Sequence, residues 1–143
     1  MDMTEEEILV KLKTSPEKRE EETMMQGLLK EWQHRLGLDN WHIALEEDVS
    51  PYCMKCGEVQ GETEYDVVNS CAVIRILNEK DYGDRILPFD KEKVLVHELL
   101  HIKMWFIHED DSDLQSKMVH QLIDDMARSL VDAKRFDNKR KKS

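Results

Sequence analysis

The sequence predicts an α+β fold, because strand-like segments stand between one long helical segment and two further ones. Apolar residues at spacings of three and four predict helices over residues 15–36, 91–108 and 112–136. Alternation and short apolar runs predict strands over residues 40–45, 57–68 and 71–77. Short turns separate these strands, so we expect a small, mostly antiparallel sheet. With 143 residues, the chain has the length of a single domain with a modest core.

The first predicted helix has a clear beginning and a clear end. Ser15 is a suitable N-cap, and Pro16 suits the first helical position because its missing N–H would have no partner there. Its apolar stripe consists of Met24, Leu28, Leu29, Trp32 and Leu36. Gly37 can adopt the left-handed conformation that closes many helices. Residues 1–14 are expected to form a loose arm.

The strands are distinguished by their apolar patterns. Trp41, Ile43 and Leu45 alternate with His42 and Ala44, which predicts a half-buried strand. Residues 71–77 form the most apolar strand, and polar turn residues stand on either side of the segment. We therefore expect this strand to contribute most to the core.

The helix predicted over residues 91–108 carries the main chemical motif, and Asp90 is placed to cap it. The motif H-E-x-x-H comprises His97, Glu98 and His101. Residues four apart lie on one face of a helix, about 6 Å apart along its axis. Two imidazoles at that spacing can bind one ion, and the Glu98 carboxylate can reach a water on the same ion. This is the arrangement of two ligands and a general base found in zinc peptidases.

The surroundings of this motif favour a metal site over a chance match. Apolar residues surround the motif on nearly all sides, which predicts a buried helix: Val94, Leu95, Val96, Leu99, Leu100, Ile102, Met104, Trp105, Phe106 and Ile107. A buried carboxylate and two imidazoles without partners would destabilise the fold by several kcal/mol. A divalent cation would supply the missing partner.

A catalytic zinc ion usually has three protein ligands, so a third is expected. His108 lies seven residues after His101, about 10 Å further along a continuous helix, which is too far to share the ion. His120 fits better, because it lies as far after the turn between the last two helices as His101 lies before it. The two residues are therefore expected to face each other across an antiparallel helix pair, and we predict that His120 is the third ligand.

The same count predicts the partner of His97. Asp124 falls level with His97, where its carboxylate could accept the free ring N–H and fix the tautomer. Asp125 is expected to face solvent. His34 and His42 are expected to be surface or packing residues rather than ligands.

The composition limits the classes of partner. The formal net charge is −10, which argues against nucleic acid and against an anionic membrane surface as the main partner. No run of about 18 apolar residues is present, so no membrane-spanning helix is expected. The acidic first residues do not resemble a secretory signal, so a cytoplasmic location is the default expectation.

Three cysteines without a signal sequence suggest reduced thiols. Cys53 and Cys56 form a C-x-x-C pair that resembles half of a zinc knuckle. Such a knuckle needs a second pair, and only Cys71 remains, within an apolar strand. A second, structural metal site at Cys53 and Cys56 is therefore the less favoured interpretation.

Together, H-E-x-x-H and an aspartate four residues after a ligand on the next helix resemble the gluzincin pattern of thermolysin-like metallopeptidases. Between Trp41 and Leu130 the chain is similar to a minimal, single-domain member of that group, such as the minigluzincins. It departs from their pattern because His120 stands where the family has a ligand glutamate. Sets of three histidines occur in the metzincin and SprT-like groups. For the residue that stabilises the transition state, Tyr65, Tyr82 and His108 remain open.

The resemblance implies a zincin-like fold and a zinc metallopeptidase. Zn²⁺ would be held by His97, His101 and His120, with Glu98 as general base. The substrate would be a peptide or protein, extended along an edge strand, for which we expect residues 71–77. A variant of this hypothesis is a regulatory protease that cuts a single protein partner. The competing hypothesis is a non-catalytic metal-binding or interaction module on the same fold.

Overall fold

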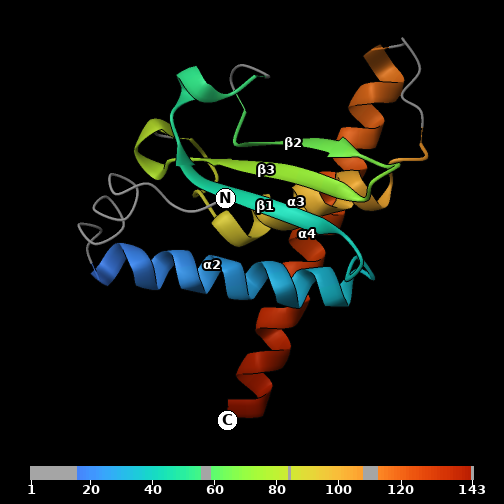
Figure 1. Cartoon of the computed structure of the whole chain (residues 1–143). Helices are drawn as coiled ribbons and strands as arrows, with labels where there is room; N and C mark the ends of the chain where they lie inside the picture. Colours follow the sequence, from blue (N-terminus) through green and yellow to red (C-terminus); the bar gives the residue numbers. More distant parts are fainter. Residues whose placement is uncertain (1–15, 56–58, 84, 108–112, 143) are drawn as a thin grey trace.

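The computed structural model describes residues 16–55, 59–83, 85–107 and 113–142. In chain order it contains the helix α2 (Pro16–Arg35), the strands β1 (His42–Val49), β2 (Gly61–Asp66) and β3 (Cys71–Leu77), and the helices α3 (Lys91–Lys103) and α4 (Asp113–Lys142). Two short 3-10 turns, η1 (Pro51–Cys53) and η2 (Glu79–Asp81), lie in the connections. This confirms the predicted α+β class (Figure 1).

The sheet is mixed rather than mostly antiparallel, with strand order β1-β3-β2. β2 and β3 form the expected antiparallel pair, but β1 pairs with β3 in parallel. The prediction was wrong because the connection after β1 does not return the chain beside that strand. β1 and β2 are not neighbours in the sheet, and β3 lies between these two earlier strands. β3 is therefore the central strand, and β1 and β2 are the edges.

The helices cover one face of this sheet. In Figure 1, α2 runs below the sheet, while α3 and α4 lie behind it. The core between these layers consists of apolar side chains from α2, β3, α3 and α4, among them Leu29, Trp32, Ile74, Ile76, Leu95, Leu99, Ile123 and Val131. Residues along β1 alternate between exposed and half-buried, as its sequence pattern predicts. No helix among the described residues is long and apolar enough to cross a membrane.

The ends of α2 agree with the sequence. The helix begins at Pro16 and ends at Arg35, and Gly37 follows with a φ of +70°. A side chain at this φ would be strained, which explains the glycine. Residues 1–14, expected to form a loose arm, lie outside the described residues.

α3 begins as predicted but ends earlier. The Asp90 side chain caps it by accepting a hydrogen bond from the Lys93 N–H. The helix ends at Lys103 rather than His108, and the N–H of Met104 contacts the carbonyls of Leu100 and Ile102. The chain then turns away from the core, so Trp105 and Phe106 are exposed rather than buried. The expectation that apolar residues are buried around the whole predicted helix therefore fails after Met104.

α4 extends further than the sequence suggested. The sequence predicts that it ends near Phe136 and that the basic residues 137–143 form a frayed tail, but the helix continues to Lys142. Its last turn contains Lys139, Arg140, Lys141 and Lys142. Positive charges there interact favourably with the helix dipole, which accounts for helix formation through a segment without apolar residues.

Candidate metal centre

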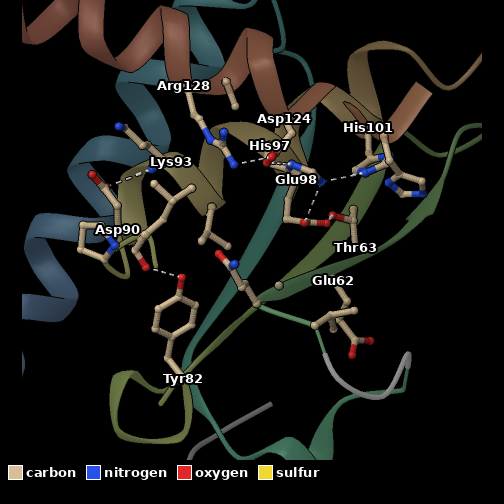
Figure 2. A pocket seen from close by; sticks show the side chains of 18 of the residues that line it. Glu62, Thr63, Tyr82, Asp90, Lys93, His97, Glu98, His101, Asp124 and Arg128 are labelled. Carbon is tan, nitrogen blue, oxygen red and sulfur yellow. Dashed lines mark hydrogen bonds and ion pairs between the residues drawn. The ribbon is translucent and has the colours of Figure 1, made fainter. Parts of the chain in front are cut away.

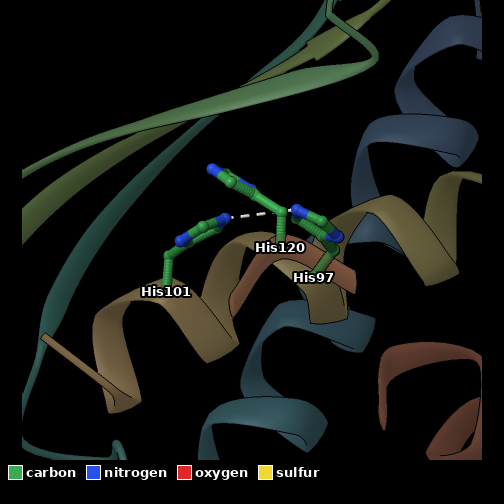
Figure 3. A group of neighbouring side chains, drawn as sticks. All are labelled: His97, His101 and His120. Carbon is green, nitrogen blue, oxygen red and sulfur yellow. Dashed lines mark hydrogen bonds between the residues drawn. The ribbon is translucent and has the colours of Figure 1, made fainter. Parts of the chain in front are cut away.

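Three histidines from two helices meet at one point (Figure 3). His97 and His101 lie one turn apart on α3, and His120 approaches them from α4. The ring of His101 lies 5.1 Å from the ring of His120 and 4.9 Å from the ring of His97, measured between centroids. Their ligand nitrogens all lie within 4.8 Å of one another, close enough to hold a metal ion. The structure therefore brings together the three residues that the sequence singled out as ligands.

The spacing of these nitrogens suits a small tetrahedral ion. The Nε2 atoms of His97 and His101 are 3.2 Å apart. Two nitrogens bound at 2.0–2.1 Å in tetrahedral geometry would stand about 3.3–3.4 Å apart. His97 and His101 therefore need little movement to share an ion, while the ligand nitrogen of His120 lies within 4.8 Å of theirs. Three imidazole nitrogen donors also suit zinc and other late transition metals better than magnesium or calcium.

Asp124 lies on α4 behind His97. Its Oδ1 is 3.3 Å from Nδ1 of His97, while its Oδ2 accepts a hydrogen bond of 2.7 Å from Nη2 of Arg128. With Nδ1 protonated, Nε2 of His97 presents its lone pair toward the other two histidines. Burial lowers the pKa of His97 and outweighs the opposing effect of the Asp124 charge. A neutral imidazole is the form that binds a metal.

Glu98 lies beside this cluster and is 5% exposed. One carboxylate oxygen is 4.0 Å from Nε2 of His97, and the other accepts a hydrogen bond of 2.8 Å from the Thr63 hydroxyl. Burial raises the pKa of Glu98 to about 7; the hydrogen bond from Thr63 lowers it, and the nearby Glu62 charge raises it. A carboxyl group with such a pKa can both take up and release a proton near neutral pH.

Gly61 allows β2 to approach α3 closely enough for this contact. A Cβ at position 61 would lie 2.7 Å from Cγ1 of Val94 and 3.4 Å from Cγ of Glu98. The first distance is shorter than real carbon contacts, so any larger residue would push the strand away from the helix. Two residues further along β2, Thr63 points to the same face and reaches Glu98.

The cluster opens into a cleft of about 620 Å³ between β2 and the α3–α4 pair (Figure 2). The lining residues come from β2 and its approach, from the segment between η2 and α3, and from both helices: Val59, Gln60, Gly61, Glu62, Thr63, Tyr65, Tyr82, Leu87, Pro88, Asp90, Lys93, Val94, His97, Glu98, His101, His120, Asp124, Ala127 and Arg128. This volume falls in the range of small-molecule and peptide-binding clefts.

Other residues named from the sequence fall in different places. Tyr65 and Tyr82 both line the cleft, and the Tyr82 hydroxyl donates a hydrogen bond to the Leu87 carbonyl. His34 and His42 are exposed and lie outside the cleft, and Asp125 is exposed as expected. His108 and Cys56 lie outside the described residues, so the alternative third ligand and the C-x-x-C site stay untested.

The prediction that residues 71–77 form the edge strand that binds the substrate was wrong. Residues 71–77 form β3, which is paired on both sides and has no free edge. The strand that lines the cleft is β2, with Gly61 and Thr63 facing α3. The sequence did not identify β2 as the strand beside the cleft for two reasons. Its residues are mostly polar, and its position next to α3 depends on the order of the strands in the sheet. Thr63, Lys93 and Arg128 also line the cleft. They belong to no recognisable motif, so the sequence did not point to them.

Comparison with other proteins adds no assignment: no family model, curated protein or solved structure matches the chain. The candidate site therefore rests on the geometry of the chain itself.

Proposed function

We propose that the protein is a zinc-dependent peptidase, with His97, His101 and His120 as metal ligands and Glu98 as general base. The observation that carries this proposal is the position of Glu98. Its buried carboxyl group lies between Thr63 and His97, within a cleft that also contains the three histidines. Three protein ligands leave a fourth position for water, which is the pattern of catalytic zinc sites.

When bound, zinc would polarise the scissile carbonyl and lower the pKa of a water molecule toward about 7. Glu98 accepts a proton from the attacking water and then donates it to the leaving amine nitrogen. The hydrogen bond from the Thr63 hydroxyl restricts rotation of the Glu98 carboxylate. Asp124 holds the ring of His97 in the orientation that directs Nε2 toward His101, where the metal would be held.

We place an extended peptide substrate along the outer edge of β2, which pairs with no further strand among the described residues. Edge strands bind peptides by main-chain hydrogen bonds, and side chains then occupy neighbouring pockets. β2 is an edge strand and lines the cleft, so a peptide added to it would pass in front of Glu98. This replaces the earlier expectation that residues 71–77 bind the substrate.

A non-catalytic metal-binding module is the competing function. A structural zinc site has four protein ligands and no need of a neighbouring carboxyl group. Among the described residues, three histidines form the candidate cluster, and the Glu98 carboxyl group lies beside it. These two observations favour the enzyme.

Digestion of a peptide pool with the zinc-loaded protein tests the proposal. We expect the wild type to cleave a subset of the pool, as detected by mass spectrometry. Glu98→Gln should keep zinc and fold but cleave at least about 100-fold more slowly, because the general base is lost. Glu79→Gln, at an exposed glutamate in η2, is the matched control and should cleave as the wild type does. Undiminished cleavage by Glu98→Gln would rule out this mechanism, and a zinc-loaded wild type that cleaves nothing would favour the non-catalytic module.

A further inference from the structure

α3 and α4 run antiparallel, so each turn of one helix lies opposite one turn of the other. His101 faces His120, and His97 faces Asp124, as the ring and hydrogen-bond distances show. Lys93 lies one helical turn before His97 on α3, and Arg128 lies one turn after Asp124 on α4. The same antiparallel pairing therefore places Lys93 opposite Arg128. Both residues line the cleft, and Figure 2 shows them on the side of His97 away from His101. Two cations therefore occupy one level of the cleft wall, next to the metal ligands.

Each of these cations has an acidic partner, but a weakly held one. Nζ of Lys93 lies 3.1 Å from Oδ1 of Asp132, whose side chain is 62% exposed. Nη2 of Arg128 lies 2.7 Å from Oδ2 of Asp124, whose side chain is 45% exposed. Solvent weakens ion pairs of this kind. A guanidinium also has five N–H donors, so its contact with Asp124 leaves others available for a ligand.

Apart from Asp124, the acidic groups of the cleft are more firmly engaged. Both oxygens of Asp90 accept hydrogen bonds from Arg135, and the buried Glu62 contacts Arg75 and the Lys55 N–H. Glu98 is occupied by Thr63. Lys93 and Arg128 are thus the charged groups best able to offer hydrogen-bond donors to a bound molecule.

We infer that Lys93 and Arg128 form a carboxylate-binding subsite, so the substrate is a peptide with an acidic side chain or its own C-terminal carboxylate near the cleaved bond. This inference rests on the proposed peptidase function and adds its substrate class. One helical turn is about 5–6 Å, and an extended peptide advances about 3.3 Å per residue. The carboxylate therefore belongs about two residues from the scissile bond.

Because the whole chain is negatively charged, binding of an acidic peptide should depend on these two cations. With a formal net charge of −10, the protein repels anionic peptides at long range. An acidic residue can be preferred only where local cations outweigh that repulsion. Reversing the charges of Lys93 and Arg128 should therefore turn the preference around rather than merely weaken it.

Selection from a random decapeptide pool tests the subsite without relying on cleavage. The zinc-loaded Glu98→Gln protein is immobilised, and bound peptides are sequenced by mass spectrometry. The same selection is made in the Lys93→Glu/Arg128→Glu background. Lys103→Glu/Lys117→Glu is the matched control, because it makes the same charge change at exposed positions of α3 and α4 outside the cleft. A second pool with amidated C-termini distinguishes a C-terminal carboxylate from an acidic side chain.

We expect Asp and Glu, or a free C-terminus, to be enriched about 10-fold or more among the bound peptides, as charge-assisted hydrogen bonds of this kind allow. The control should show the same enrichment, and the double reversal should lose it and favour Lys and Arg. Equal selection in all three backgrounds, or no bound peptide at all, would overturn the subsite. Because binding is measured on a variant without its base, failure of the subsite remains distinct from failure of the peptidase activity, which the digestion tests.

Discussion

Asp124 of α4 joins the two helices at the candidate metal centre, because one carboxylate oxygen contacts His97 of α3. The other oxygen contacts Arg128, one turn further along α4, so the carboxylate is held in place where it orients the His97 ring. Partners of this kind fix the tautomer of a ligand and increase its basicity. The affinity for zinc should therefore depend on Asp124 although it is not one of the three candidate ligands.

Replacing Asp124 with alanine should weaken zinc binding by about 10–100-fold, the range typical of lost partners of metal-bound histidines. Asp125→Ala is the control, because this neighbour is exposed and lies about 100° around the helix. Zinc affinity is measured by competition with a chelator, on variants shown to be folded. Equal affinities for the two variants would mean that Asp124 is a surface acid without influence on His97.

At this scale, the sequence predicted the candidate site well where helical spacing decides position. His97, His101, His120 and Asp124 meet because residues three or four apart share a helix face and two antiparallel helices face each other in levels. The helix ends were predicted less accurately, since α3 is five residues shorter than expected. The predicted pairs, His101 with His120 and His97 with Asp124, nevertheless lie opposite each other. Thr63 could not be found, because its contact with Glu98 depends on which strand lies next to α3.

The contact between β2 and α3 is the element-scale feature that shapes the cleft. Gly61 has no room for a side chain against Val94, and this close approach brings the strand to Glu98. The sequence shows a glycine within a polar strand, but it does not show that this glycine packs against Val94. The sheet order was also missed, because the sequence between β1 and β2 carries no signal that these strands are not neighbours in the sheet.

Gly61→Ala should destabilise the fold by about 1–3 kcal/mol, because the added methyl group overlaps Val94. The same change should displace Thr63 and reduce peptide cleavage. Urea unfolding measures the stability. Gly27→Ala is the control, because a Cβ at that helical position meets no atom within 4 Å and should leave the fold as stable or more so.

A double variant tests whether Val94 is the group that clashes. In the Val94→Ala background, Gly61→Ala should cost less than it does alone, since the smaller side chain leaves room. An equal cost in both backgrounds would show that the added methyl group clashes with another atom instead, such as the Arg75 carbonyl oxygen, which would lie 3.2 Å from it.

For the molecule as a whole, Glu92 connects three helices. This buried residue of α3 accepts hydrogen bonds from Nε1 of Trp32 in α2, at 2.7 Å, and from Nζ of Lys134 in α4, at 2.6 Å. Arg135 of α4 contacts its other oxygen at 3.1 Å. These contacts hold the C-terminal half of α4 against α3, several turns from His120. They therefore help to keep the third histidine level with the other two.

Protonation of Glu92 should destabilise the fold in acid. Burial favours the neutral form, but hydrogen bonds from Lys134 and Trp32 and the charge of Lys134 outweigh it, so the pKa of Glu92 is lowered from 4.5. Since the pKa is lower in the folded state, this stabilisation is complete above about pH 4.5 and is lost as pH falls through the folded-state value.

Glu92→Gln should accordingly cost on the order of 3 kcal/mol at pH 7, because Lys134 loses its buried partner. The difference from the wild type should shrink as the pH is lowered below 4.5. Urea unfolding over this pH range measures it, with the exposed Glu79→Gln as control. A difference that stays constant with pH would show that the charge of Glu92 does not contribute.

X-ray absorption at the zinc edge tests the central claim most directly, because it reports the ligands of the bound ion. The histidine site predicts one zinc per chain with three imidazole nitrogens and one further oxygen at about 2.0–2.1 Å, and no sulfur. Substitution of His120 by alanine should remove one imidazole from that set or release the ion. Sulfur ligands at about 2.3 Å would instead place the metal at a cysteine site such as Cys53 and Cys56, and would contradict the metal centre described for His97, His101 and His120.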